Sequence, residues 1–138
     1  VLLVEGVGGL LALLAKGKTV ASLGQALDAQ LIVVAPNRVG VINQVLLTIE
    51  AAINRGLKVA LVVLMGQKEA DDSVPENADL IRQNLPEMTG FKGVIEFPYL
   101  GPGASDPSLI TDHANKAGKV LCQVAELLAL NGPSGAGD

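Results

Sequence analysis

Four continuous runs of apolar residues constrain the fold of this chain more than any other feature. Apolar residues do not alternate with polar ones in these runs, as happens when a strand is buried on both faces of a parallel sheet. Aromatic residues make up only 2% of the sequence, so aliphatic side chains must fill the core. The expected strands are residues 1–5, 31–35, 59–64 and 93–97.

Helical patterns lie between these runs, because apolar residues recur there every three or four positions. The alternation of strands and helices with short connections predicts right-handed crossovers. We therefore expect an α/β fold, a doubly wound and mostly parallel sheet with helices on both faces. The domain should cover residues 1–131, and residues 132–138 should form a disordered tail. The expected helices are residues 20–29, 40–55 and 77–85, and a last helix from Asp106 to just before Asn131.

Charge and composition narrow the possible partners. The net charge is −4 and the Lys and Arg residues are scattered, whereas a nucleic-acid partner would require a clustered basic face. No apolar run is long enough to span a bilayer, and no basic segment precedes the first run as in a signal peptide. The single cysteine, Cys122, falls on an apolar helical stripe and is expected to be buried in a reducing compartment. We therefore expect a cytoplasmic protein that binds neither nucleic acid nor membranes.

Ligands of doubly wound sheets bind outside the carboxyl ends of the strands. Glu5 stands at the end of the first apolar run, and Gly-Val-Gly-Gly follows it. A carboxylate at this place can hold Mg²⁺ directly or through water, while the glycines let a phosphate approach the backbone. The alternative is a solvated strand end followed by turn glycines, and the motif alone does not decide between them. The other strand ends to inspect are residues 35–40, 65–69 and 98–105.

Longer motifs point to a known family. The segments VLLVEGVGGLL, LIVVAPNRVGVINQVLLTIEAAINRGLKVALVVL, ENADLI and FPYLG, read in order, resemble dethiobiotin synthetase. The resemblance covers about residues 1–125, and RVGVINQVLLTIEA is its most specific part. It implies a P-loop NTPase-like fold and an ATP- and Mg²⁺-dependent reaction that makes dethiobiotin from 7,8-diaminopelargonate and CO₂.

The resemblance also implies roles for individual positions. Glu5 corresponds to the family's magnesium-binding glutamate. The start of the helix at 40–55 matches the family's loop and helix start, which face the diamino acid across a homodimer interface. Leu46 and Leu47 extend the apolar surface of this helix beyond one stripe, although a leucine exposed by chance is the alternative for Leu47. The implied substrate contacts are Val39, Gly40 and Asn43. The implied nucleotide contacts are Glu5, Gly6, Val7, Gly8, Met65, Gly66, Pro98, Tyr99 and Leu100.

The sequence departs from the family pattern at two places. The family's phosphate loop ends in Gly-Lys-Thr on an earlier strand and helix, so we expect this chain to lack that strand and loop. The Gly-Lys-Thr at 17–19 does not replace them, because Leu13 stands where the loop needs a glycine; we expect residues 16–19 to form a surface loop. Met65 stands where the family has an asparagine that reads the adenine edge, and methionine cannot form that pair of hydrogen bonds.

Three functions stay open at this point. The first is the ring-closing ligase, or the C-terminal two-thirds of such an enzyme. The second is a non-catalytic dimerisation or regulatory module of the same fold, which Met65 and the missing phosphate loop favour. The third is a related amidotransferase-type ligase that acts on corrin precursors. Outside these motifs, His113 is expected to be structural, and the acidic run of Glu69, Asp71 and Asp72 is expected to be solvated.

Overall fold

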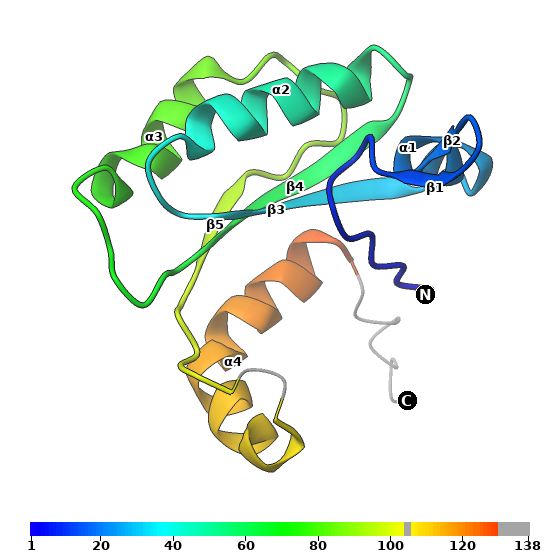
Figure 1. Ribbon diagram of the computed structural model, residues 1–138. Helices are drawn as coiled ribbons and strands as arrows, with labels where there is room; N and C mark the ends of the chain where they lie inside the picture. The colour runs from blue at the N-terminus through cyan, green and yellow to red at the C-terminus, as the bar shows by residue number, and fades with distance from the viewer. Residues whose placement is uncertain (104–105, 130–138) are drawn as a thin grey trace, which may run out of the picture.

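A computed structural model of the protein describes residues 1–103 and 106–129, and Figure 1 traces its chain. A short antiparallel hairpin comes first, and helices alternate with strands after it. The elements are β1 (Leu13–Ala15), β2 (Lys18–Thr19), α1 (Val20–Ala26), β3 (Gln30–Pro36), α2 (Val41–Ile53), β4 (Lys58–Met65), α3 (Val74–Asn84), β5 (Val94–Phe97), a 3₁₀ helix (Pro107–Leu109) and α4 (Ile110–Leu127).

The strands β3, β4 and β5 form a parallel sheet in that order, with β4 in the centre. At the carboxyl edge of the sheet, Met65 pairs with Pro36 on one side and with Phe97 on the other. The helices α2 and α3 cover one face, and α4 covers the other (Figure 1). The expected α/β fold, with parallel strands and helices on both faces, is confirmed.

Strand β4 explains why its apolar run does not alternate. Val62 and Leu64 pack on the face that α2 and α3 cover, whereas Leu61 and Val63 pack on the face that α4 covers. Successive side chains of a strand point to opposite faces, so both sets must be apolar when helices cover both faces. Full burial of one such side chain contributes about 1.5–3 kcal/mol. Because β4 buries side chains on both faces, it links the two helical layers.

The helices on the first face follow the expected periodicity. Gly56, which follows α2, has a φ of +70°, a conformation that glycine adopts readily, and the chain turns there into β4. Helix α3 begins earlier than the expected residue 77, because Pro75 fits the first turn of a helix, where no N–H donor is needed. The buried stripe of α2 consists of Val41, Val45, Ile49 and Ala52.

The expected strand at residues 1–5 is wrong. Residues 1–4 have no regular secondary structure, and their side chains are 52–105% exposed. A β-prone run becomes a strand only when a neighbouring strand supplies hydrogen-bond partners. The backbone after this run is instead tied to α1, where the Ala21 N–H donates to the Leu10 carbonyl oxygen at 2.9 Å. The run therefore lies on the α1 side of the molecule without joining the sheet (Figure 1).

The residues expected to form a plain surface loop at 16–19 belong to a hairpin. β1 and β2 pair antiparallel, with Leu13 opposite Thr19, and Gly17 has a φ of +69° in the turn between them. Thr19 also caps α1, because its hydroxyl oxygen accepts the Ser22 N–H at 3.2 Å. The Gly-Lys-Thr triplet thus forms a turn and a helix cap.

Helix α4 buries only part of the apolar surface that its sequence offers. Ile110 is 62% exposed and Leu121 is 49% exposed, and the expected burial of Cys122 is wrong because its side chain is exposed. The helix has apolar residues on more than one side, and only the side that meets the sheet can be buried. The expected tail at 132–138 lies outside the described residues. The stripe facing the core consists of His113, Ala117, Val120, Val124 and Leu127.

Within residues 1–103 and 106–129, no helix has both the length and the apolar character that crossing a bilayer requires.

Candidate functional site

The carboxyl ends of the three parallel strands meet at one edge of the sheet. The Asn37 N–H donates to the Met65 carbonyl oxygen at 2.8 Å, and the Gly66 N–H donates to the Phe97 carbonyl oxygen at 2.7 Å. These bonds continue the sheet by one residue and carry it into the loops. Five of the residues expected to contact a nucleotide therefore lie at this edge, namely Met65, Gly66, Pro98, Tyr99 and Leu100.

Gly66 is held between backbone atoms. A Cβ atom added there would lie 2.7 Å from the Tyr99 nitrogen and 3.0 Å from the Phe97 oxygen. Real Cβ atoms essentially never approach backbone so closely, so the chain after β5 can pass this point only because no side chain is present. The close passage of the backbone explains this glycine without any ligand.

Tyr99 and Leu100 form the outer part of this edge. The Tyr99 side chain is 42% exposed, so one part of its ring is available to a ligand. Lys116 of α4 donates from Nζ to the Leu100 carbonyl oxygen at 2.9 Å, which ties the loop to the helix that follows. An aromatic face beside a fixed loop can border a planar base.

The Met65 side chain packs against the apolar face that α4 covers, where it joins Leu61 and Val63. It therefore presents a thioether, which cannot supply paired hydrogen bonds to a base. The nearest side-chain amide in the sequence is that of Gln67, which donates from Nε2 to the Met65 oxygen at 2.8 Å and to the Gly66 oxygen at 3.2 Å. Nucleotide selectivity at this position stays a prediction.

The three residues expected to contact the diamino acid lie around the start of α2. Val39 is 74% exposed, and Gly40 and Asn43 are exposed as well. Gly40 precedes the helix with a φ of +87°, which favours glycine there. Because Asn37 is bonded to the end of β4, this group lies at the same carboxyl edge as Met65. The structure thus brings two of the three expected groups of residues to one edge.

The third group, residues 5–8, lies elsewhere. A Cβ atom on Gly6 would lie 2.9 Å from Cγ1 of Val20, which places this segment against the start of α1. Figure 1 shows α1 and the N-terminal segment on the side opposite the carboxyl ends of β3, β4 and β5. Glu5, Gly6, Val7 and Gly8 are all exposed, and the structure does not bring them to Met65 and Tyr99.

Magnesium requires several oxygen ligands in a near-octahedral arrangement. Glu5 supplies one exposed carboxylate, and no cluster of three or more Asp, Glu, His or Cys side chains suited to a metal occurs among residues 1–103 and 106–129. These residues do not by themselves fit a magnesium site. The role of Glu5 as a metal ligand stays a prediction.

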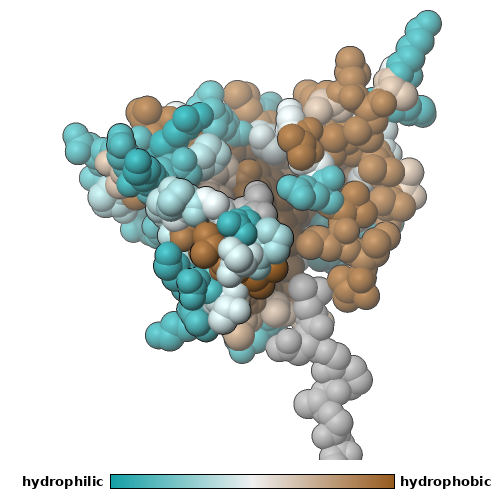
Figure 2. Space-filling model, turned by 60° about the horizontal axis from the view of Figure 1, so that its bottom comes forward, coloured by the Kyte–Doolittle hydropathy of each residue, from teal (hydrophilic) through white to brown (hydrophobic). Residues whose placement is uncertain are grey.

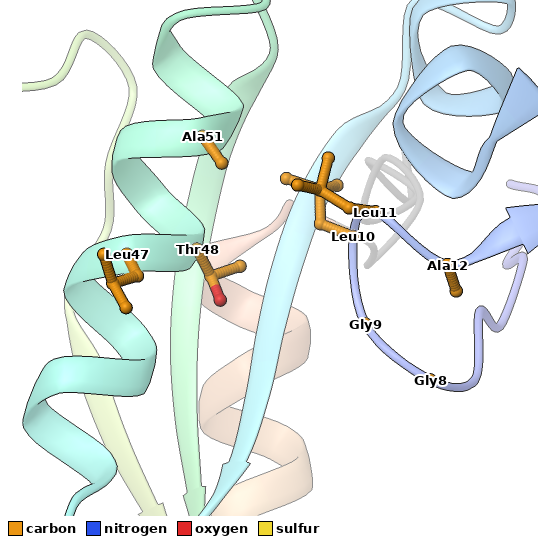
Figure 3. A pocket seen from close by; sticks show the side chains of 8 residues that line it. All are labelled: Gly8, Gly9, Leu10, Leu11, Ala12, Leu47, Thr48 and Ala51. Atoms are coloured by element: carbon orange, nitrogen blue, oxygen red, sulfur yellow. The ribbon is translucent and has the colours of Figure 1, made fainter. Parts of the chain in front are cut away.

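An open hollow of about 450 Å³ lies between residues 8–12 and α2. Figure 3 shows Leu10 and Leu11 on one side of it and Leu47, Thr48 and Ala51 on the other. None of its lining residues is charged, so it offers no side-chain cation to a phosphate. Apolar residues near the hollow in the sequence are also exposed, among them Val7 at 81% and Leu13 at 77%. Figure 2 shows a broad apolar surface on its right, the side on which Figure 1 places the N-terminal segment.

Sequence reasoning missed a polar network at the carboxyl edge. Asn37 and Asn77 are only 3% and 2% exposed, and Asn77 donates from Nδ2 to Oδ1 of Asn37 at 2.8 Å. The carboxylate of Asp71, expected to be solvated, also accepts hydrogen bonds from Val39 and Ser73. These bonds lower the pKa of Asp71, the Ser73 hydroxyl most and the Val39 N–H next. No local pattern marks the contacts between the two loops, since Asn37 lies 40 positions from Asn77 and Val39 lies 32 positions from Asp71.

The parallel sheet, the helices on both faces and the loops gathered at the carboxyl edge define an α/β domain, and the family match places it in the P-loop NTPase-like class. A model of the AAA domain family matches residues 1–105, and the chain belongs to that family.

Individual relatives carry the similarity further. The chain is 38% identical over 131 residues to the ATP-dependent dethiobiotin synthetase BioD of Corynebacterium diphtheriae, covering 94% of this chain and 52% of that protein. Identity to the enzyme of the same name from Corynebacterium glutamicum is 40% over 106 residues, which are 76% of this chain and 44% of that one. Identity to the enzyme of the same name from Anaeromyxobacter dehalogenans is 47% over 76 residues, which are 54% of this chain and 34% of that enzyme. The resemblance to dethiobiotin synthetase is confirmed, and the chain spans about half the length of the curated relatives it matches, or less.

Proposed function

We propose that this chain is part of an ATP-dependent dethiobiotin synthetase, which closes the ureido ring of dethiobiotin. The observation that carries the proposal is the meeting of two groups of residues at one edge of the sheet. Tyr99 and Leu100 can border a purine base, and Val39, Gly40 and Asn43 at the start of α2 can contact a diamino acid.

The proposed reaction needs positioning more than it needs a protein nucleophile. A carbamate forms on one amine of 7,8-diaminopelargonate from CO₂, and ATP phosphorylates the carbamate oxygen with release of ADP. The second amine then attacks the carbamoyl carbon, loses a proton, and phosphate leaves. In this scheme the exposed amide of Asn43 donates to or accepts from the polar end of the substrate, and Tyr99 holds the base.

Phosphate binding is the part that these residues do not supply. Thr19 of the Gly-Lys-Thr triplet caps α1, and the triplet belongs to the β1–β2 hairpin instead of ending a glycine-rich loop. We infer that the triphosphate is held by a phosphate loop outside this sequence, and that Glu5 is one of several magnesium ligands only when that part is present.

The direct test is dethiobiotin formation from diaminopelargonate, bicarbonate and Mg-ATP, measured by mass spectrometry. The chain is assayed alone and together with a dethiobiotin synthetase fragment that carries the glycine-rich phosphate loop. We expect product only from the mixture, and we expect Asn43→Ala to abolish it while the exposed control Asn84→Ala does not. Product from the chain alone would contradict the inference that a phosphate loop outside this sequence holds the triphosphate. A mixture that binds Mg-ATP but never yields product would contradict the proposed ligase activity.

We also propose that the chain forms a homodimer through the start of α2. Val39 is 74% exposed and Leu47 is 57% exposed, so apolar surface lies beside the expected substrate contacts. Sedimentation analysis of Leu47→Lys should give a monomer where the parent chain gives a dimer. Leu121→Lys on α4, where Leu121 is 49% exposed, is the matched control and should remain dimeric.

A second function has an observation of its own. Met65 lacks the hydrogen-bonding groups of an amide, and residues 5–8 lie away from the carboxyl edge, as would suit a dimerisation or regulatory module without catalysis. Calorimetry separates the two functions. Saturable Mg-ATP binding by the mixture, weakened by Glu5→Ala, favours the ligase, whereas dimerisation without any nucleotide binding favours the module. On the grounds of its sequence, we propose that either protein acts in the cytoplasm.

A further inference from the structure

Two loops meet at the carboxyl edge of the sheet although they are far apart in the sequence. One runs from β3 to α2 and contains Val39, and the other runs from β4 to α3 and contains Asp71 and Ser73. Figure 1 shows the beginnings of α2 and α3 on the same side of the molecule. The contact between the loops is a hydrogen bond between residues 32 positions apart, in which the Val39 N–H donates to Oδ2 of Asp71 at 2.8 Å.

The Asp71 carboxylate is engaged at both oxygens. While Oδ2 accepts from Val39, Oδ1 accepts from the backbone N–H of Ser73 at 2.9 Å and from the Ser73 hydroxyl. Hydrogen bonds to an ionised acceptor are shorter and stronger than those between neutral groups. The side chain is therefore held in one orientation, aimed at the turn before α2.

A buried amide pair supports this arrangement from behind. Asn77 donates from Nδ2 to Oδ1 of Asn37 at 2.8 Å and to the Ser73 hydroxyl oxygen at 3.1 Å. The Asn37 N–H in turn donates to the Met65 carbonyl oxygen at the end of β4. Because a buried polar group without a partner is costly, these bonds hold Asn37 and Asn77 in place behind Ser73. A continuous chain of hydrogen bonds thus links the end of β4 to Asp71.

Helix α2 lacks the features that usually fix a helix start. Its N-cap residue is Gly40, which has no side chain to accept a backbone N–H, and its first turn contains no acidic residue. Asp71 compensates in part from another part of the chain, since its carboxylate binds the N–H of Val39, the residue before the N-cap Gly40. A negative charge at this place also interacts favourably with the helix dipole.

We propose that Asp71 is a positioning residue that fixes the turn before α2 and so orients Val39, Gly40 and Asn43. The effect of Asp71 on binding of the diamino acid rests on the proposed function, whereas its effect on the turn before α2 does not. Asp71 touches no substrate in this role and acts through Val39.

The test uses hydrogen–deuterium exchange on the whole chain for Asp71→Asn, with Asp72→Asn as the matched control. Asp72 is the exposed neighbouring acid, for which no hydrogen bond occurs within the described residues. We expect the amides of residues 39–44 to exchange about tenfold faster in Asp71→Asn, with β4 and β5 unchanged, because a charge-assisted bond is lost. Asp72→Asn should match the parent chain, and Ser73→Ala should give a smaller increase in the same segment. Unchanged exchange in 39–44, or an increase spread equally over β4 and β5, would overturn the proposal.

Binding measurements separate this inference from the proposed function. With the phosphate-loop fragment present, Asp71→Asn should weaken binding of the diamino acid at least tenfold and leave Mg-ATP binding unchanged. If exchange rises locally but the parent mixture never binds the diamino acid, the role of Asp71 in the turn stands and the proposed function fails. If the diamino acid binds equally well to Asp71→Asn and to the parent, the turn does not orient the substrate contacts and the proposal is overturned.

Discussion

Replacement of Gly66 by alanine tests most directly how the carboxyl edge is built. The added Cβ would lie 2.7 Å from the Tyr99 nitrogen and 3.0 Å from the Phe97 oxygen, and both atoms belong to backbone that cannot rotate away. The loop after β5 would have to move, which typically costs about 1–3 kcal/mol for an overpacked site. Loss of the 2.7 Å bond from the Gly66 N–H to the Phe97 oxygen would add about 1 kcal/mol.

We therefore expect Gly66→Ala to lower the free energy of unfolding by about 2–4 kcal/mol. Urea unfolding followed by circular dichroism measures this, and the midpoint should fall by about 1 M or more at the usual slope of 1–3 kcal/mol per molar urea. Gly118→Ala in α4 is the matched control, because nothing lies within 4 Å of its added Cβ. Alanine in a helix interior should stabilise the chain by about 0.5–1 kcal/mol.

An unchanged midpoint for Gly66→Ala would refute this reasoning. It would mean that the backbone does not approach Gly66 closely in solution. If the same variant kept its stability but lost nucleotide binding, the glycine would be required by a ligand and not by packing.

Three further predictions concern the polar network and α4. Asn77→Ala should cost about 1–3 kcal/mol of unfolding free energy, because buried Asn37 loses its partner, whereas exposed Asn84→Ala should cost little in the same urea experiment. The pKa of Asp71 is lowered by Ser73 and then Val39, so its contribution to stability is present above about pH 4 and is lost as pH falls through the lowered value. Thermal melts measured across this pH range should show a weaker dependence of the melting temperature on pH for Asp71→Asn than for the parent chain. Exposed Cys122 should react with a thiol reagent as completely in the native chain as in urea, and slow native labelling would contradict its exposure.

The network also shows why part of the site could not be read from the sequence. The family motifs predicted that Met65, Gly66 and Tyr99 belong to one site, and the structure brings these three residues together at the end of β4 and β5. The motifs did not predict Asp71, because hydrogen bonds across 32 residues leave no periodic signal. The prediction that Glu5 lies at the carboxyl end of a strand is wrong, since its segment has no strand beside it in the described residues.

The sequence alone determined the strands and helices whose periodicity matches their surroundings. β4 is apolar from Val59 to Met65 because helices cover both faces, and α2 repeats apolar residues every three or four positions, so the residue pattern of each predicts its structure. Tertiary structure decided which of the apolar sides of α4 is buried and that residues 1–5 do not form a strand. The periodicity of apolar residues is a local property of a segment, whereas its burial and strand pairing depend on which distant segment is available to cover it or pair with it.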